Sequence, residues 1–139
     1  PAMAIELRDG TIVSGGTSEL LGAASSALIN ALKVLAGIDK EVKLIDPKAI
    51  DPIQDLKINY LGSKNPRLHT DEVLTALSAT AANNEIAMKA MKKLPLLKGC
   101  DAHSTVLLSS VDEQIFKKLG IQLTCEPKYE EDERMYHKN

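Results

Sequence analysis

Aromatic residues are scarce in this sequence, and tryptophan is absent. Aromatics make up 3% of the chain, and Phe116 is its one phenylalanine. The core must therefore be built from aliphatic side chains. No apolar run approaches the roughly 20 residues that a membrane-spanning helix needs, so we expect no contact with a membrane.

Cysteine is also rare, which excludes a disulfide scaffold. Cys100 and Cys125 are the two cysteines, and no stretch that resembles a signal peptide precedes them. We therefore expect two reduced thiols and a cytoplasmic location, and the spacing leaves open whether the two thiols are close. Cys100 and His103 would give zinc only two ligands, so no zinc site is expected, and any other cofactor is left open.

A strong charge of either sign is missing as well. The chain has 17 Lys and Arg against 19 Asp and Glu, a formal net charge of −2 at pH 7. This balance gives no general attraction to nucleic acid, and the basic "MKAMKK" stretch has no aromatic residues on which bases could stack. We expect no nucleic-acid partner, and any anion site must be local.

The chain has the length of one domain. Its 139 residues suffice to bury a core without disulfides or metals. We assign residues 1–127 to a single α/β domain, and residues 128–139, which are charged and lack periodicity, to a loosely ordered tail. A strand-like segment begins at Pro1 without an initiator Met, which indicates a piece of a longer polypeptide.

Hydrophobic periodicity and turn residues predict strands that alternate with helices. Asp9-Gly10 is typical of a hairpin turn, and Gly37 is expected to end the first helix. In chain order we predict a hairpin (4–15), a helix (17–38), a strand (42–46), a helix (51–61), two helices (70–82 and 85–94), a strand (103–109), a helix (111–120) and a strand (121–126).

Short polar residues supply the expected helix caps. Thr17 or Ser18 can begin the first helix, and an Asp-Pro pair can begin the second. A capping box can begin the last helix. The second helix would begin at Asp51-Pro52, and the capping box of the last helix consists of Ser110 and Glu113.

This element order predicts a three-layer α/β/α sandwich with a mostly parallel sheet and an antiparallel N-terminal hairpin. A hairpin that feeds a buried first helix is typical of the cytidine-deaminase-like fold. Zinc deaminases need His or Cys with a nearby Glu at one helix start and P-C-x-x-C at another. The segments "LLGAASS" and "DPIQD" contain no such ligand, so we predict this topology without the zinc site.

The segment "LGSKNPRLHTDEVL" (61–74) is the strongest candidate for a binding loop. Its basic and amide side chains precede a helix whose free N–H groups point back toward it, which suits a phosphate or carboxylate. In the alternative, Lys64 and Arg67 are solvated and pair with Asp71 and Glu72. The candidate ligand residues are Ser63, Lys64, Asn65, Arg67, His69 and Thr70.

Two further segments contain residue types that carry chemistry. Cys100, Asp101 and His103 include a thiol nucleophile and a base, although Cys100 could equally be buried and the others shape a loop. His103, Ser104 and Thr105 are also candidate ligand contacts. The glycines of "SGGTSELLG" could cradle a phosphate, but a hairpin exit followed by a helix cap explains them as well.

Three long segments together resemble a known bacterial family. "LGSKNPRLHTDEVLTALS", "GCDAHSTVLLSSVDEQIFKKLGIQLTCEP" and "DGTIVSGGTSELLGAASSALINALKVLAGI" are similar to the C-terminal domain of the domain-of-unknown-function 1846 proteins, also filed as uncharacterised protein family 0371. The resemblance implies a longer cytoplasmic chain with a larger α/β region before this domain, and a cytidine-deaminase-like C-terminal part. It also implies that residues 63–72 and 103–105 matter.

Two hypotheses of function follow. In the first, Lys64, Asn65, Arg67 and His69 hold an anionic group of a phosphorylated or nucleotide-like ligand, and His103 faces them across the cleft of an enzyme site that other domains complete. In the second, the domain is an interaction or oligomerisation module that packs on the rest of its chain or on a second copy. A small polar concave surface around Arg67 would favour the first, and an exposed aliphatic patch the second.

Overall fold

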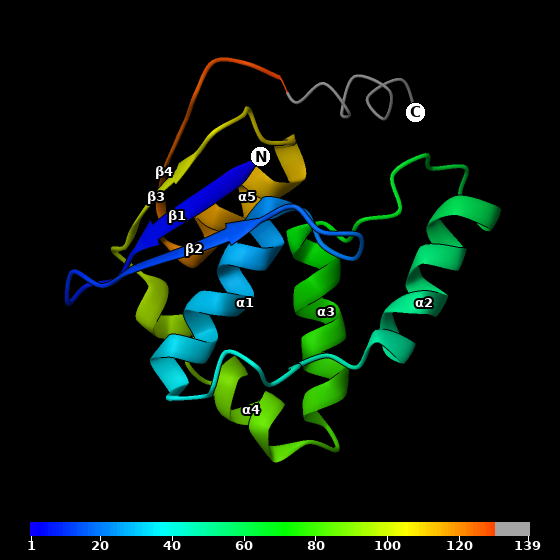
Figure 1. The fold of residues 1–139 in the computed structure, drawn as a ribbon, viewed down its shortest axis with the longest axis horizontal. Helices are drawn as coiled ribbons and strands as arrows, with labels where there is room; N and C mark the ends of the chain where they lie inside the picture. The colour runs from blue at the N-terminus through cyan, green and yellow to red at the C-terminus, as the bar shows by residue number, and fades with distance from the viewer. Residues whose placement is uncertain (130–139) are drawn as a thin grey trace.

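The computed structural model describes residues 1–129, which form one α/β unit (Figure 1). The expected tail, 128–139, lies almost entirely outside this range. Within the described residues, no helix is long and apolar enough to cross a membrane. The core is aliphatic as predicted, with Phe116 fully buried among Leu, Ile, Val and Ala side chains.

A four-stranded mixed sheet has the order β2-β1-β3-β4. β1 pairs antiparallel with both β2 and β3, while β3 and β4 are parallel. The hairpin and its turn at Gly10 (φ 89°) are confirmed, but the prediction of a mostly parallel sheet is wrong. The cytidine-deaminase-like topology stays a prediction. The strands are β1 (Ala2–Glu6), β2 (Ile12–Gly16), β3 (Asp101–Ser104) and β4 (Gln122–Cys125).

The helices cover one face of this sheet. Side chains alternate along each strand, so Met3, Ile5 and Ala102 are buried, whereas His103 and Thr124 on the opposite face are exposed. The protein therefore has two layers in residues 1–129, and the three-layer prediction is wrong. The sequence did not show this, because short alternating strands fit either arrangement.

Helix α1 (Ala23–Ala36) packs on β1 and β2 at very close range. A Cβ atom at Gly15 would lie 2.3 Å from the backbone nitrogen of Ala27, so the contact requires glycine. The helix ends at Gly37 (φ 67°), as predicted. Its predicted start is wrong, because Gly22 is the N-cap and the Ser18 hydroxyl instead accepts from two nitrogens in the preceding turn.

Residues 42–46 form no strand, which corrects the prediction. Leu44 and Ile45 are buried, but this segment does not join the sheet. Asp46 caps helix α2 (Pro47–Asp55) by accepting from the nitrogen of Lys48 at 2.9 Å. The chain contains two Asp-Pro pairs, and the first begins the helix, so the predicted start at residue 51 is wrong. A π-helical turn, η1 (Leu56–Tyr60), follows directly.

Three further helices lie where the sequence predicted them, but some of their ends differ from the prediction. The first begins at Thr70 and the second at Glu85, as predicted, and Asn84 caps the second. The last is capped by Ser109 instead of Ser110, and residues 105–109, predicted as strand, are a loop after the end of β3. These helices are α3 (Thr70–Ala81), α4 (Glu85–Met91) and α5 (Ser110–Leu119), and a 3-10 turn, η2 (Leu94–Leu97), follows α4.

Candidate functional site

A small pocket lies where the starts of three helices meet. Gly22 is the N-cap of α1, His69 is the N-cap of α3, and Asp112 lies in the first turn of α5. All three line the pocket. The positive ends of three helix dipoles therefore point toward one place. The other lining residues are Pro1, Thr17, Ala23, Ala24, Asn65, Arg67, Leu68, Val106 and Leu108.

The three helix starts differ in how their free N–H groups are satisfied. Glu72 accepts from the His69 nitrogen at 2.8 Å, and Ser109 Oγ accepts from the Asp112 nitrogen at 3.2 Å. Gly22 has no side chain to accept from α1, and no side-chain cap is present there. The N–H groups of Ala23 and Ala24 thus have no acceptor within residues 1–129, and both residues line the pocket.

The loop before α3, residues 61–69, is held by its own side chains and is here called the site loop. The Asn65 nitrogen donates to Ser63 Oγ at 3.1 Å, and the Arg67 nitrogen donates to Asn65 Oδ1 at 3.0 Å. Arg67 Nε donates to the Ser18 carbonyl at 2.6 Å. Ser63 therefore shapes the loop, while the side-chain Nδ2 of Asn65 and the terminal nitrogens of Arg67 have no acceptor in the described part of the chain.

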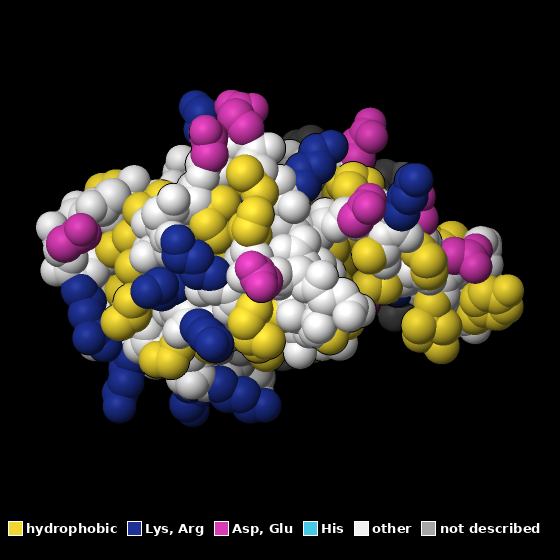
Figure 2. All heavy atoms as spheres, turned by 90° about the horizontal axis from the view of Figure 1, so that it is seen from below, with side chains coloured by type: hydrophobic (Ala, Val, Ile, Leu, Met, Phe, Trp, Pro, Cys, Tyr) yellow, Lys and Arg dark blue, Asp and Glu magenta, His cyan; other side chains and the backbone are white. Residues whose placement is uncertain are grey.

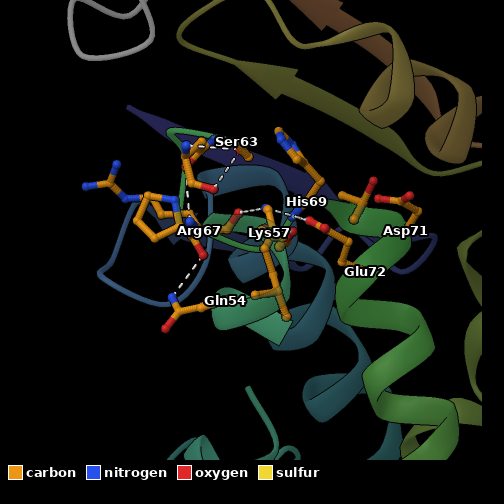
Figure 3. A network of polar contacts seen from close by, with 12 residues as sticks. Gln54, Lys57, Ser63, Arg67, His69, Asp71 and Glu72 are labelled. Carbon is orange, nitrogen blue, oxygen red and sulfur yellow. Dashed lines mark hydrogen bonds and ion pairs between the residues drawn. The ribbon is translucent and has the colours of Figure 1, made fainter. Parts of the chain in front are cut away.

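Lys57 and Gln54 support the site loop from the arm formed by α2 and η1. Lys57 is buried, and its Nζ donates to the Arg67 carbonyl and, at 2.8 Å, to Glu72 Oε1. Gln54 Nε2 donates to the Pro66 carbonyl at 2.9 Å. Figure 3 shows Lys57 between the backbone of the site loop and Glu72. The arm thus fixes the backbone that presents Asn65 and Arg67.

The alternative in which Lys64 and Arg67 pair with Asp71 and Glu72 is wrong. Glu72 is occupied by Lys57 and by the start of α3, and within residues 1–129 neither Lys64 nor Arg67 forms an ion pair with Asp71 or Glu72. Lys64 is exposed and does not line the pocket. Of the cations predicted in this segment, Arg67 is the one at the pocket.

His69 and Asp112 form a pair across α3 and α5. The His69 Nδ1 lies 3.5 Å from Asp112 Oδ2. Asp112 Oδ1 accepts from the Thr70 nitrogen at 2.9 Å and from its hydroxyl at 2.7 Å. Thr70 is fully buried, so this predicted ligand residue anchors Asp112 and does not itself line the pocket.

The pair shifts the pKa of both partners. The hydrogen bond that the His69 ring donates to Asp112 raises the pKa of His69 above 6.5, against the opposing effects of burial and of Lys57. Burial would raise the pKa of Asp112, but the hydrogen bonds from His69 and Thr70 outweigh it and hold that pKa below 3.8. The pair therefore favours a protonated His69 beside a carboxylate.

His103, Ser104 and Thr105 lie apart from this pocket. His103 is on the exposed face of the sheet, with Nδ1 2.6 Å from Thr124 Oγ1 and Nε2 4.0 Å from a Glu126 oxygen. Ser104 is buried and donates to the Val106 carbonyl at 2.7 Å. Thr105 Oγ1 accepts from the Ala2 nitrogen at 2.9 Å. The structure does not bring His103 together with His69.

The thiol segment has no nucleophile and base in contact. Cys100 is buried, its Sγ lies 3.6 Å from the Leu96 carbonyl, and burial raises the pKa of the thiol. Asp101 is exposed. Cys100 and Cys125 are free, as expected. In the described range, no three His, Cys, Asp or Glu side chains form a group that could hold a metal.

Sequence reasoning missed Asp112, Lys57 and Gly22 at the site. Ser109 and Asp112 have the spacing of a capping box one residue before the pair that we chose, so a signal for Asp112 was present. Lys57 is the one basic residue of "DLKINYL" and carries no local sign of burial. Gly22 gains its role only because the site loop lies against it, with its nitrogen 3.3 Å from the Leu68 carbonyl.

Comparison with known proteins finds similarity along nearly the whole chain. The family model described as "Domain of unknown function DUF1846, C-terminal" matches residues 1–136. A UPF0371 protein of Corynebacterium glutamicum (strain R) is 58% identical over 130 residues, which cover 94% of this chain and 26% of that protein. The UPF0371 protein stu1377 of Streptococcus thermophilus is 54% identical over 137 residues, 99% of this chain and 28% of that protein. The chain thus spans just over a quarter of the length of these relatives.

Proposed function

The chain belongs to the DUF1846 family as its C-terminal domain, and from the geometry of its pocket we propose that it binds an oxyanion. The oxyanion is the phosphate or carboxylate group of a small phosphorylated or nucleotide-like ligand. The observation that carries the proposal is the start of α1, which lines the pocket and whose first N–H groups have no side-chain cap. Such helix starts are ready-made anion sites.

Three kinds of donor belong to residues that line this pocket. They are the uncapped backbone N–H groups of Ala23 and Ala24, the side-chain amide of Asn65 and the guanidinium of Arg67. A guanidinium binds phosphate or carboxylate oxygens with two parallel hydrogen bonds. Because the Nε of Arg67 is already held by Ser18, its two terminal nitrogens are pre-oriented donors.

The small size of the pocket suits an anionic group better than a whole substrate. We infer that the remainder of the ligand is bound by the part of the longer protein that precedes this domain. This agrees with the first hypothesis drawn from the sequence, in which other domains of a cytoplasmic bacterial protein complete an enzyme site. Within residues 1–129 the pocket offers binding groups and one histidine, and no thiol or hydroxyl nucleophile lines it other than Thr17.

Isothermal titration with inorganic phosphate tests this proposal. We expect Arg67→Ala to weaken binding at least about tenfold, because it removes a charge-assisted pair of hydrogen bonds worth roughly 1.5–3 kcal/mol. Lys64→Ala is the matched control, since Lys64 is exposed and outside the pocket, and it should change affinity less than twofold. Equal affinities of wild type and Arg67→Ala would rule the site out.

A second candidate function is docking, and the surface of the arm favours it. Leu56 and Tyr60 of the arm and Leu61, the residue that follows it, are 48%, 75% and 71% exposed. Figure 1 shows α2 to one side of the helices that cover the sheet, and Figure 2 shows hydrophobic side chains gathered at that end of the molecule. Exposed apolar clusters of this kind mark interaction sites.

We infer that the occupant of this surface is the larger part of the same polypeptide. The chain spans 26% and 28% of the two relatives described, so most of their length lies outside this domain. The same arm supports the site loop through Gln54 and Lys57. Docking there would bring the rest of the protein next to the oxyanion pocket.

Thiol labelling of Leu61→Cys in a full-length family protein tests the docking. We expect labelling at least about tenfold slower than that of Lys92→Cys, an exposed position on the opposite side of α3, because docking would bury the new thiol. Slow labelling that speeds up on dilution would assign the surface to a second copy. Equal rates for the two variants would exclude docking at the arm.

A further inference from the structure

Asp112 is held so rigidly that only one of its oxygens is left to act on another group. Its Oδ1 accepts two hydrogen bonds from Thr70, and its own nitrogen donates to Ser109. The residue is 8% exposed. A carboxylate fixed at both its backbone and one oxygen presents Oδ2 in a constant position, and that oxygen faces His69.

The imidazole of His69 is thereby oriented toward the pocket. With Nδ1 facing Asp112, its other nitrogen, Nε2, has no hydrogen-bond partner among residues 1–129. His69 lines the pocket beside the uncapped start of α1. When one ring nitrogen of a histidine donates to a carboxylate, as Nδ1 does here, the other nitrogen, Nε2, is the one that faces outward.

We propose that His69 is a protonated donor to the oxyanion bound in this pocket, and that Asp112 is the positioning residue that holds it charged and oriented. The inference rests on the proposed function and specifies its ligand as a dianionic tetrahedral group, such as that of a phosphate monoester. With His69 charged, Arg67 and His69 together exceed Asp112 by one positive charge. With His69 neutral this excess is lost.

The charged groups around His69 agree with this role. Asp112 on α5 and Glu72 on α3 favour its protonated form, and Lys57 on η1 opposes it. The combined effect raises the pKa of His69. Histidine is the side chain that ordinarily changes charge in the neutral pH range, so the charge of His69 is the source of the expected pH dependence between about pH 6 and 9.

An NMR titration of the His69 ring, with sulfate as the probe, tests the proposal. Sulfate is chosen because its own charge stays constant over this pH range, whereas phosphate titrates. The wild type, Asp112→Asn and His69→Gln are compared. Asn retains an oxygen for Thr70, and Gln retains a neutral donor, so neither change should remove the fold.

We expect Asp112→Asn to lower the pKa of His69, because it removes the carboxylate that favours the protonated ring. Sulfate affinity in the wild type should fall at least about fivefold from pH 6 to pH 8.5. In His69→Gln it should be weaker and nearly independent of pH. A spectrum with the dispersion of the wild type confirms that each variant is folded.

The outcomes separate the two proposals. An unchanged His69 titration in Asp112→Asn, or sulfate binding with equal affinity at both pH values, would overturn the role of the pair while leaving the oxyanion site standing. Absence of sulfate binding at every pH, with His69 still shifted by Asp112, would overturn the oxyanion site, and with it this inference.

Discussion

Single residues fix the close contacts on which the site depends, and Gly15 is the clearest case. The start of α1 is placed by the packing of this helix on β2, where Gly15 meets the backbone of Ala27. Gly15→Ala should lower the free energy of unfolding by about 1–3 kcal/mol or more, because the new methyl group would meet rigid backbone. Urea denaturation measures this loss.

Gly16→Ala is the control for that prediction. A Cβ at Gly16 would meet only the Pro1 carbonyl, at the ordinary contact distance of 3.7 Å. Its stability should therefore lie within about 0.5 kcal/mol of the wild type. If Gly15→Ala is as stable as Gly16→Ala, the close approach of β2 to α1 is wrong.

Lys57 is the residue whose loss should most disturb the site loop. Its side chain is 7% exposed and pairs with Glu72. Lys57→Met removes one partner of a buried pair and should cost about 3 kcal/mol, whereas Lys64→Met on the surface should cost less than about 0.5 kcal/mol. Thermal or chemical denaturation of both variants checks this, and a cost for Lys57→Met as small as that of Lys64→Met would contradict the buried pair.

The His69–Asp112 pair gives stability a defined pH dependence. The pKa of His69 is raised in the folded protein, so its contribution is complete below pH 6.5 and is lost as the pH rises through the folded value. The pKa of Asp112 is lowered, so its contribution is present above pH 3.8 and is lost as the pH falls through the folded value. Asp112→Asn should therefore cost more stability at pH 5.5 than at pH 9. Urea denaturation at both pH values checks this, and an equal cost would contradict the pair.

At the scale of elements, the sequence predicted where most helices lie and often missed where they begin. Ser109 and Ser110 can both cap a helix, and so can both aspartates of "DPKAIDP". When two suitable cap residues lie close together, the sequence does not show which of them begins the helix. The predicted strand at 42–46 failed for another reason. Leu44 and Ile45 are buried in the core although their segment pairs with no strand. Burial alone does not distinguish a strand from a loop.

The arm should be the least stable helical part of the domain. α2 buries one residue, Ile50, whereas α1 is buried along most of its length. Native-state hydrogen exchange on this chain should therefore show amides of α2 exchanging at least about tenfold faster than those of α1. Equal protection of both helices would contradict the loose packing of the arm. In a full-length family protein the difference should shrink if the arm is docked.

At the scale of the whole molecule, the site exists because distant segments meet. The sequence predicted a binding role for the site loop from a local pattern, basic and amide residues before a helix, and its Asn65, Arg67 and His69 line one pocket. It could not predict that this loop lies against Gly22 or that α5 brings Asp112 to His69. Those contacts join residues that are more than 40 positions apart, and they depend on how the helices pack on one face of the sheet.

The same limit applies to the sheet. Alternating strands and intervening helices predicted an α/β class correctly, but the position of β1 between β2 and β3 makes the sheet mixed and is not visible in any local pattern. His103 was grouped with the site loop on residue type alone. The alternation of side chains in β3 places it on the exposed face of the sheet.

A 15N NMR titration of this chain with inorganic phosphate shows whether an oxyanion binds at the start of α1. We expect saturable shifts of the Ala23 and Ala24 amides, together with the side-chain signals of Asn65 and Arg67, while amides on the open face of the sheet stay unchanged. If those four signals do not move, or if shifts appear only at exposed lysines such as Lys64, no oxyanion binds in this pocket.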